Sequence, residues 1–240
     1  MEKQEDIYEK FKPNAEKNLV IEVDGEKYER FPVKLPVIMD KDDIYKIIDD
    51  NTKGYRKEDD MIYVSEKIVA ISQGRAFKVD EIKVSKLANF LQKHVTKTSV
   101  GIGLGSPQTM ELAIRELGRP RILFAAAVAA VTKPLGIKGM FYRICGPKAR
   151  AIDGPCHYTL PPYNHYAKLA PKDPDKVARK LRDYLKVSEA IVIDANDIGQ
   201  NVLGKSNRKL SNKKMAAIFG DNPLGQTNEQ TPCAIVRKIK

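Results

Sequence analysis

The stretch DPDKVARKLRDYLKVSEAIVID, residues 173–194, predicts a helix followed by a buried strand. Asp173-Pro174-Asp175 is a strong helix start, because proline suits the first helical turn. The run from Glu189 to Asp194 is apolar, has the length of a strand and ends on a carboxylate. The expected apolar stripe of the helix consists of Val177, Leu181, Tyr184 and Leu185. A helix beside a buried strand indicates a fold of the α/β or α+β class.

The rest of the chain adds helices and strands in mixed order, which leaves both classes, α/β and α+β, open. Alternation on both sides of Asp24-Gly25 predicts a hairpin over Leu19–Val33. Asp42 and Asp43 are expected to start a helix. Further expected elements are a strand at Met61–Val64, a segment at Lys67–Ile71 that continues or follows it, helices at Val84–Leu91, from Ser106 to Gly118 and at Met215–Phe219, strand signals at Phe141–Ile144, and a strand at Cys233–Arg237. We expect a charged, loosely docked segment at residues 1–18 and one fold over 19–240, with two possible subdomains.

The longest apolar run, Ile122–Val131, predicts either a buried strand or a buried helix. About ten residues are too few to span a bilayer, which needs roughly 20, and the N-terminal charges precede no apolar core of the kind a signal peptide has. The chain has three cysteines, Cys145, Cys156 and Cys233, too few for a disulfide scaffold. We therefore expect a cytoplasmic protein without membrane association.

The charge of the chain favours an anionic partner. The net charge is +11, and residues 1–60 carry 17 acids and 12 bases, which places the excess in residues 61–240. Nucleic acid, a nucleotide with its metal, or an acidic small molecule would fit, whereas a lysine-rich surface serving solubility alone is the plain alternative. Nucleic acid is the weakest of these, because no basic stretch is interleaved with aromatic residues.

Three aspartates, Asp153, Asp194 and Asp197, follow apolar segments where α/β proteins place ligands. They suit Mg²⁺ or Mn²⁺, which accept a few carboxylates plus substrate phosphates, although aspartate also favours ordinary turns. Lys67, after a predicted strand, could reach a phosphate or be a solvated surface lysine. The glycines between Gly101 and Gly105 lack a phosphate-loop motif and indicate a connector.

The cysteines and histidines give weak support to metal or nucleophile chemistry. No Cys-x-x-Cys spacing occurs. Cys156 and His157 are neighbours, and neighbours on an extended chain point in opposite directions. Cys233 is expected to be an apolar filler in its strand.

Six segments, in this order, resemble the coenzyme F420-0:L-glutamate ligase (CofE-like) family. They are LPVIMDKDDI at Leu35–Ile44, DMIYVSEKIVAISQGR at Asp60–Arg75, AIDGP at Ala151–Pro155, LAPKDPDKVARKLRDYL at Leu169–Leu185, AIVIDANDIGQ at Ala190–Gln200 and GQTNEQTPCAIVR at Gly225–Arg237. No single motif is specific, whereas their order and spacing together are.

The resemblance implies a two-domain α+β fold with mixed sheets and flanking helices, and a homodimer. The activity that it implies is that of a GTP- or ATP-dependent γ-glutamyl (acid–amino-acid) ligase. In this reaction a carboxylate becomes an acyl phosphate, and the amine of L-glutamate displaces phosphate to form an amide. Mg²⁺ or Mn²⁺ would assist, and the acceptor would be an acidic small molecule. The residues implied are Lys67 and Asp153 for catalysis; Leu35, Pro36, Val37, Ile38, Glu66, Lys67, Cys156, Gly225, Gln226 and Glu229 for nucleotide; and Asp153, Asp194, Asn196, Asp197 and Gln226 for metal.

The sequence departs from the family pattern at several positions. Ile71 stands where the family has a second lysine, Gln226 replaces a glutamate, and Cys156 stands where asparagine is usual. A proline-rich insertion covers Tyr158–Tyr166. These departures leave open a paralogue that binds nucleotide without ligation, or one that glutamylates another acceptor such as a folate.

Overall fold

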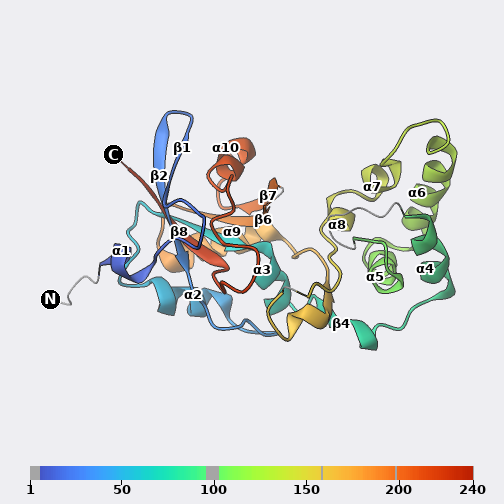
Figure 1. Ribbon diagram of the computed structural model, residues 1–240, viewed down its shortest axis with the longest axis horizontal. Helices are drawn as coiled ribbons and strands as arrows, with labels where there is room; N and C mark the ends of the chain where they lie inside the picture. The colour runs from blue at the N-terminus through green and yellow to red at the C-terminus, as the bar shows by residue number, and fades with distance from the viewer. Residues whose placement is uncertain (1–5, 96–102, 158, 198, 240) are drawn as a thin grey trace. The chain divides into compact units, whose positions relative to one another are not determined.

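The computed structural model describes residues 6–95, 103–157, 159–197 and 199–239 (Figure 1). The chain divides into two compact units. Unit 1 comprises Met1–Gln73 and Pro171–Lys240, and unit 2 is the continuous stretch Gly74–Ala170. The expected α+β class is confirmed, since both units combine helices with strands.

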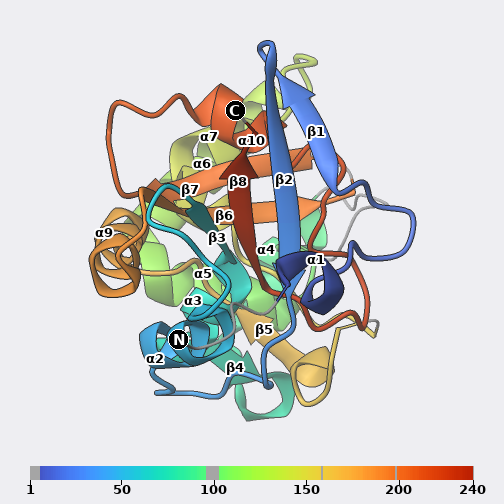
Figure 2. The same cartoon turned by 90° about the vertical axis from the view of Figure 1, so that its left-hand side faces the viewer.

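Unit 1 is built on a six-stranded mixed sheet with strand order β1-β2-β8-β3-β6-β7 (Figure 2). The strand β8 pairs antiparallel with both β2 and β3, and β3 pairs parallel with β6. The strands are β1 Val20–Val23, β2 Glu26–Val33, β3 Met61–Ser65, β6 Glu189–Asn196, β7 Gly199–Lys205 and β8 Cys233–Lys238. The helices are α1 Ile7–Lys10, α2 Ile44–Thr52, α3 Glu66–Ser72, α9 Pro174–Leu185 and α10 Asn212–Ala217.

Helices cover the sheet of unit 1, and the side chains between them are apolar. Tyr63, Ile191 and Ile193 share one face of the sheet because strand side chains alternate, and they are fully buried in a cluster with Met215 and Phe219 around α10. The Tyr63 and Phe219 rings stack with centroids 4.1 Å apart. Helix α9 packs along β6 and β7. This packing holds the ends of β6 and β7 in a fixed arrangement.

Several sequence expectations for unit 1 are confirmed. The β1–β2 hairpin turns at Asp24 and Gly25, both with positive φ, as its Asp-Gly turn requires. Asp43 caps α2, and α9 begins at Pro174. Lys67–Ile71 belongs to helix α3 rather than to a continuation of β3, because the Ser65 side chain accepts the Lys67 N–H and starts a helix.

The N-terminal segment differs from the expectation of a loosely docked start. From residue 6 onward it contacts unit 1: Ile7 and Phe11 are buried, and Lys17 pairs with Asp197. Asn14 donates to the Pro223 carbonyl oxygen over 2.9 Å and to the Thr231 hydroxyl over 2.8 Å. These anchors bring the segment next to the loops that follow β7.

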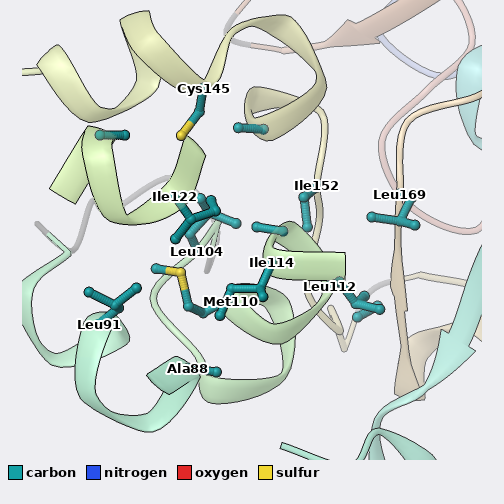
Figure 3. Close-up of a cluster of buried hydrophobic side chains, with 14 of the residues drawn as sticks. Ala88, Leu91, Leu104, Met110, Leu112, Ile114, Ile122, Cys145, Ile152 and Leu169 are labelled. Carbon is teal, nitrogen blue, oxygen red and sulfur yellow. The ribbon is translucent and has the colours of Figure 1, made fainter. Parts of the chain in front are cut away.

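Unit 2 is mainly helical, with a two-stranded sheet, and has its own apolar core. Figure 3 shows Leu104, Met110 and Ile122 gathered between helices of this unit. Its helices are α4 Lys86–Leu91, α5 Pro107–Leu117, α6 Arg119–Thr132, α7 Met140–Cys145 and α8 Pro147–Arg150, with short 3-10 turns at Val79–Glu81, Gln92–His94 and Tyr163–His165; the strands are β4 Ala76–Lys78 and β5 Tyr166–Lys168. As expected, Ser106 caps α5 with Pro107 in its first turn.

One expectation for unit 2 is correct in part and another is wrong. Ile122–Val131 lies in helix α6, which agrees with the helix alternative, but only Ile122 and Ala125 of that run are buried. The five alanines of this run favour a helix. A run of apolar residues does not by itself show which of its side chains are buried. Phe141–Ile144 forms helix α7 instead of a strand, because it is delimited by Gly139 and Gly146 and packs against α6. The glycine connector expected at Gly101–Gly105 lies partly outside the described residues. Tyr158 and Ile198 also lie outside them.

Candidate functional site

The loop after β6 contains a polar cluster built around Asp197. The Asp197 N–H donates to Gln226 Oε1 over 3.2 Å. The side-chain amide of Asn222 donates to Asp197 Oδ1 over 3.1 Å and to Gln226 Oε1 over 3.3 Å. Lys17 Nζ lies 3.0 Å from Asp197 Oδ1. Two residues expected to bind metal, Asp197 and Gln226, are therefore brought together through Asn222.

The Asp197 carboxylate is held in its charged form. The hydrogen bond from Lys17, and then that from Asn222, lower the pKa of Asp197 below its ordinary value. A carboxylate with a lowered pKa stays ionised at neutral pH and can attract a cation or a donor group of a substrate. The side chain is half exposed to solvent, so this charge is accessible.

Asn222 holds the cluster together from within the protein. It is fully buried, has a positive φ of 51°, and also donates to the Gly225 carbonyl oxygen over 3.0 Å. Its Oδ1 is buried and accepts no hydrogen bond among the described residues. Neither Asn222 nor Lys17 was predicted from the sequence. The dipeptide Asn222-Pro223, typical of turns, was the only available signal.

The turn from Gly225 to Glu229 is closed by the glutamate side chain. Gly225 has a φ of +79°, and a Cβ there would overlap the Glu229 carboxyl group. The Glu229 carboxylate accepts from the Thr227 N–H over 2.7 Å and from the Thr227 hydroxyl over 3.0 Å. Glycine is therefore favoured at 225 by its positive φ, and a side chain there would also displace the Glu229 carboxyl group.

The loop Leu35–Ile38 is tied to the segment that follows this turn. The Leu35 N–H donates to the Gln230 carbonyl oxygen over 3.1 Å, and the Gln230 side chain donates to the Leu35 carbonyl oxygen over 2.6 Å. Leu35 and Ile38 are buried, whereas Pro36 and Val37 are exposed. Two loops expected to contact a nucleotide are thus joined by a reciprocal pair of hydrogen bonds.

A hollow of about 580 Å³ opens beside this junction. Three lysines line it, Lys10, Lys12 and Lys34, together with Leu35 and Gln230. Lysine ammonium groups attract phosphate and carboxylate groups as point charges. The hollow is therefore suited to an anionic ligand.

The other predicted residues of unit 1 lie on β6 and α3. Asp194 and Asn196 share one face of β6, and Asp194 faces Asn201 of β7 in the sheet register. Asn196 Oδ1 accepts from the Gly199 N–H over 3.1 Å. Glu66 opens α3 and is buried, whereas Lys67 next to it is half-buried.

Ile71, where the resemblance of the sequence implies a second lysine, is buried in α3. Its environment is apolar packing rather than a ligand surface, since Ile68, Val69 and Ala70 of the same helix are also buried. An aliphatic residue satisfies that environment, and a charged lysine head group would be costly to bury there.

Asp153 and Cys156 belong to unit 2, unlike the other predicted site residues. The Asp153 and Lys168 backbones exchange hydrogen bonds of 3.1 and 2.9 Å, and Lys168 Nζ lies 3.0 Å from Asp153 Oδ2. Lys168 is buried, whereas the Asp153 carboxylate is exposed. Cys156 is half-buried; Cys233, as expected, fills the core of unit 1, where burial raises the pKa of its thiol to about 12.

The Asp197 cluster has the donor type that a hard divalent cation prefers. Asp197, Asn222 and Gln226 all carry side-chain oxygens, and the Asn222 oxygen lacks a hydrogen bond in the described structure. Over residues 6–95, 103–157, 159–197 and 199–239, no group of three or more His, Cys, Asp or Glu side chains is arranged to hold a metal. Mg²⁺ commonly binds one or two carboxylates plus substrate phosphates, so the cluster suits an ion that arrives with a nucleotide.

Part of the chain is similar to a known protein family. Residues 32–138 match the family described as F420-0:Gamma-glutamyl ligase. The matched range includes the Leu35–Ile38 loop and Lys67 and ends before Asp153, Asp197 and Gln226. No curated protein matches the chain.

Proposed function

We propose that the chain, whose residues 32–138 match the F420-0:Gamma-glutamyl ligase family, is a nucleotide- and metal-dependent γ-glutamyl ligase. The nucleotide would be GTP or ATP, the amine donor L-glutamate, and the acceptor an acidic small molecule. The assembly proposed with this activity is a homodimer.

The observation that carries the proposal is the junction of the Leu35–Ile38 loop with the Gly225–Thr231 segment. The reciprocal hydrogen bonds between Leu35 and Gln230 join a family-matched loop to the segment that contains Gln226. Gln226 in turn accepts from Asp197 and Asn222. An ionised carboxylate, oxygen donors and three lysines therefore lie on connected loops, a combination suited to a nucleotide and its cation.

The proposed reaction has two steps. An acceptor carboxylate oxygen attacks the terminal phosphorus of the nucleotide, and the nucleoside diphosphate leaves, which gives an acyl phosphate. The glutamate amine then attacks the acyl carbon, phosphate leaves, and the amine loses a proton. The oxygen of a free carboxylate is a poor leaving group, whereas phosphate is a good one. Transfer of phosphate from the nucleotide therefore activates the carboxylate for amide formation.

The residues of this chain would act mainly by binding and orientation. Lys67 and the lysines of the hollow would hold phosphate oxygens and offset their charge. Asp197 of unit 1 would hold Mg²⁺ or Mn²⁺, which supplies charge neutralisation at the transferring phosphoryl group when bound. Asp153 of unit 2 is a separate candidate metal ligand. Asn222 would orient the Asp197 carboxylate by its hydrogen bond.

The test is phosphate release by the purified protein with GTP or ATP, Mg²⁺ or Mn²⁺, L-glutamate and a panel of deazaflavin and folate acceptors. Release is expected only when an acceptor is present. Asp153→Asn and Asp197→Asn are each expected to lower turnover at least a hundredfold. Asp24→Asn, in the exposed turn of the β1–β2 hairpin, is the matched control and is expected to keep full activity. Full turnover in both site variants would contradict the assignment.

A second candidate is a paralogue that keeps nucleotide binding without ligation, or glutamylates a different acceptor. Gln226 and the buried Ile71 favour it, since each replaces a charged residue of the family pattern. Calorimetry with GTP and ATP, each with and without Mn²⁺, distinguishes the two candidates. Nucleotide binding without phosphate release under any acceptor would support the non-ligating paralogue, and turnover with a folate alone would support the changed acceptor.

A further inference from the structure

Helix α6 of unit 2 carries apolar side chains on the face that points to solvent. Leu123, Phe124 and Val131 are exposed, with exposed fractions of 63% for Phe124 and 67% for Val131. Ala127 and Ala130 are exposed as well. These positions recur every three or four residues, so they form one continuous stripe along the helix. Leu135, 71% exposed, and Ile137 extend the apolar surface beyond the helix end.

This arrangement differs from that of an ordinary surface helix. Such a helix buries its apolar face and exposes a polar one, and α6 does bury Ile122 and Ala125. Its opposite face is nevertheless apolar too, and Arg119 and Arg121 in the first turn are its only charged residues. Single exposed apolar side chains are common on proteins, whereas a contiguous apolar stripe marks an interaction surface.

The charges around the stripe have one sign. Residues 117–152 contain seven basic residues and no aspartate or glutamate. All seven are exposed: Arg119, Arg121, Lys133, Lys138, Arg143, Lys148 and Arg150. Lys148 pairs with Glu116, just outside the segment. We call this segment, with the α6 stripe, the acid-free surface.

The exposed apolar stripe and the positive charges around it together favour one class of partner. A second copy of the acid-free surface would place seven positive charges against seven, which opposes self-association there. Nucleic acid would match the charges and would leave the exposed Leu, Phe and Val side chains without an apolar partner. A bilayer containing anionic phospholipid matches both, because acyl chains receive the apolar side chains and lipid phosphates attract the lysines and arginines.

We propose that the acid-free surface binds the surface of an anionic phospholipid bilayer, with α6 lying in the interface. No helix in the described part of the chain is long and apolar enough to cross a membrane, so the association is peripheral. Helix α6 has 14 residues, about 21 Å in length. Leu123, Phe124 and Val131 enter the boundary between head groups and acyl chains. This inference does not depend on the ligase activity.

The test is co-sedimentation of the full chain with vesicles of phosphatidylcholine alone or with about one third phosphatidylglycerol. Binding is expected to the anionic vesicles and to weaken as salt is raised. Phe124→Ser is expected to weaken it about tenfold or more, since the variant loses most of the apolar area that the phenylalanine would bury in the bilayer. Phe90→Ser is the matched control, because Phe90 is 61% exposed on α4 of the same unit and lies outside the acid-free surface. Lys133→Gln is expected to weaken binding about fivefold.

A second measurement uses the absence of tryptophan from the chain. Phe124→Trp is expected to give fluorescence that shifts to shorter wavelength when anionic vesicles are added, and Phe90→Trp fluorescence that does not shift. No binding to anionic vesicles at low salt, or equal binding by the two serine variants, would overturn the proposal. A dimer that Phe124→Ser converts to monomer, without vesicle binding, would overturn it in favour of a second copy. Binding of RNA unaffected by Phe124→Ser, again without vesicle binding, would overturn it in favour of nucleic acid.

Discussion

Arg30 is a fully buried cation whose charge is balanced by one carboxylate. Its guanidinium is paired with Asp221, with one contact of 3.0 Å, and donates to the Asn18 and Ile218 carbonyl oxygens over 2.6 and 3.1 Å. Burial alone would raise the pKa of Asp221, but the hydrogen bond and charge of Arg30 outweigh it and lower that pKa. Arg30 therefore joins β2 to the segment before β1 and to the loop after α10.

Replacing Asp221 by Asn should destabilise unit 1 by about 2 kcal/mol, because a buried charged donor loses its charged acceptor. The carboxyl pKa is lower in the folded state, so its contribution is fully present above about pH 4 and is lost as pH falls through the folded-state pKa. Denaturant unfolding followed by circular dichroism between pH 2 and 7 measures this. The variant should show a shallower fall in stability on the acid side.

The control for this variant is Asp183→Asn, which removes an exposed ion pair with Arg182. Such pairs contribute about 0–1 kcal/mol, so its unfolding curve should stay close to that of the unaltered chain. An Asp221→Asn variant as stable as this control at pH 7 would contradict the assignment.

The residues of the Asp197 cluster could be predicted from the sequence only in part. Asp197 and Gln226 were expected to bind metal, and they do lie together. Asn222 and Lys17, which orient and charge-balance Asp197, were missed, because they come from segments far apart in the chain that only the fold brings together. The roles of Lys67 and Asp153 stay predictions.

The contact between α9 and β7 depends on a glycine. A Cβ on Gly204 would overlap the backbone of Pro174 and Asp175 at the start of α9. Asp175 also accepts the Lys205 N–H over 2.9 Å, which fixes this end of the helix against the strand. Helix α9 and β7 can therefore approach closely only while residue 204 has no side chain.

Replacing Gly204 by Ala should lower the free energy of unfolding by about 1–3 kcal/mol, because backbone atoms must move to accept the added methyl group. Gly199→Ala, in the same strand with open space around its Cβ position, should be nearly neutral. Chemical denaturation of both variants measures the difference. Equal stability of the two variants would show that α9 and β7 are less closely packed than described.

Elements with a strong start signal or a clear period were predicted well. Helices α2, α5 and α9 each begin at the expected residues. Strands β4, β5 and β7 were not anticipated. Two of these are only three residues long, and β7 contains two glycines and a lysine among its seven residues. Their strand conformation comes from pairing with a neighbour rather than from their own composition.

The two units of the molecule have separate cores and unequal charge. The buried cluster of unit 2 lies within residues 82–169, and that around α10 draws only on unit 1. Unit 2 carries 15 basic and five acidic residues, a net charge of +10, out of +11 for the chain. From the sequence, the excess positive charge was assigned to residues 61–240. Composition alone does not show the boundaries of unit 2, because these are set by the fold.

Removing unit 2 should leave a folded unit 1. The Gln73 side chain and the Lys172 backbone exchange hydrogen bonds of 3.0 and 2.7 Å, so the two ends of unit 1 at the excision meet. Replacing Gly74–Ala170 by a short Gly-Ser linker is expected to give a protein that unfolds cooperatively and retains strand signal in circular dichroism. A gradual, non-cooperative transition would contradict this expectation.

Strand β8 has a consequence for how the chain folds as it is synthesised. It lies between β2 and β3 although about 170 residues of chain separate it from β3. On the ribosome, β2 and β3 emerge early and wait for their shared partner, while all of unit 2 has already left the tunnel. Unit 2 can therefore fold first, and the centre of the sheet closes last. The exposed edges of β2 and β3 during that interval are where a chaperone would be most needed.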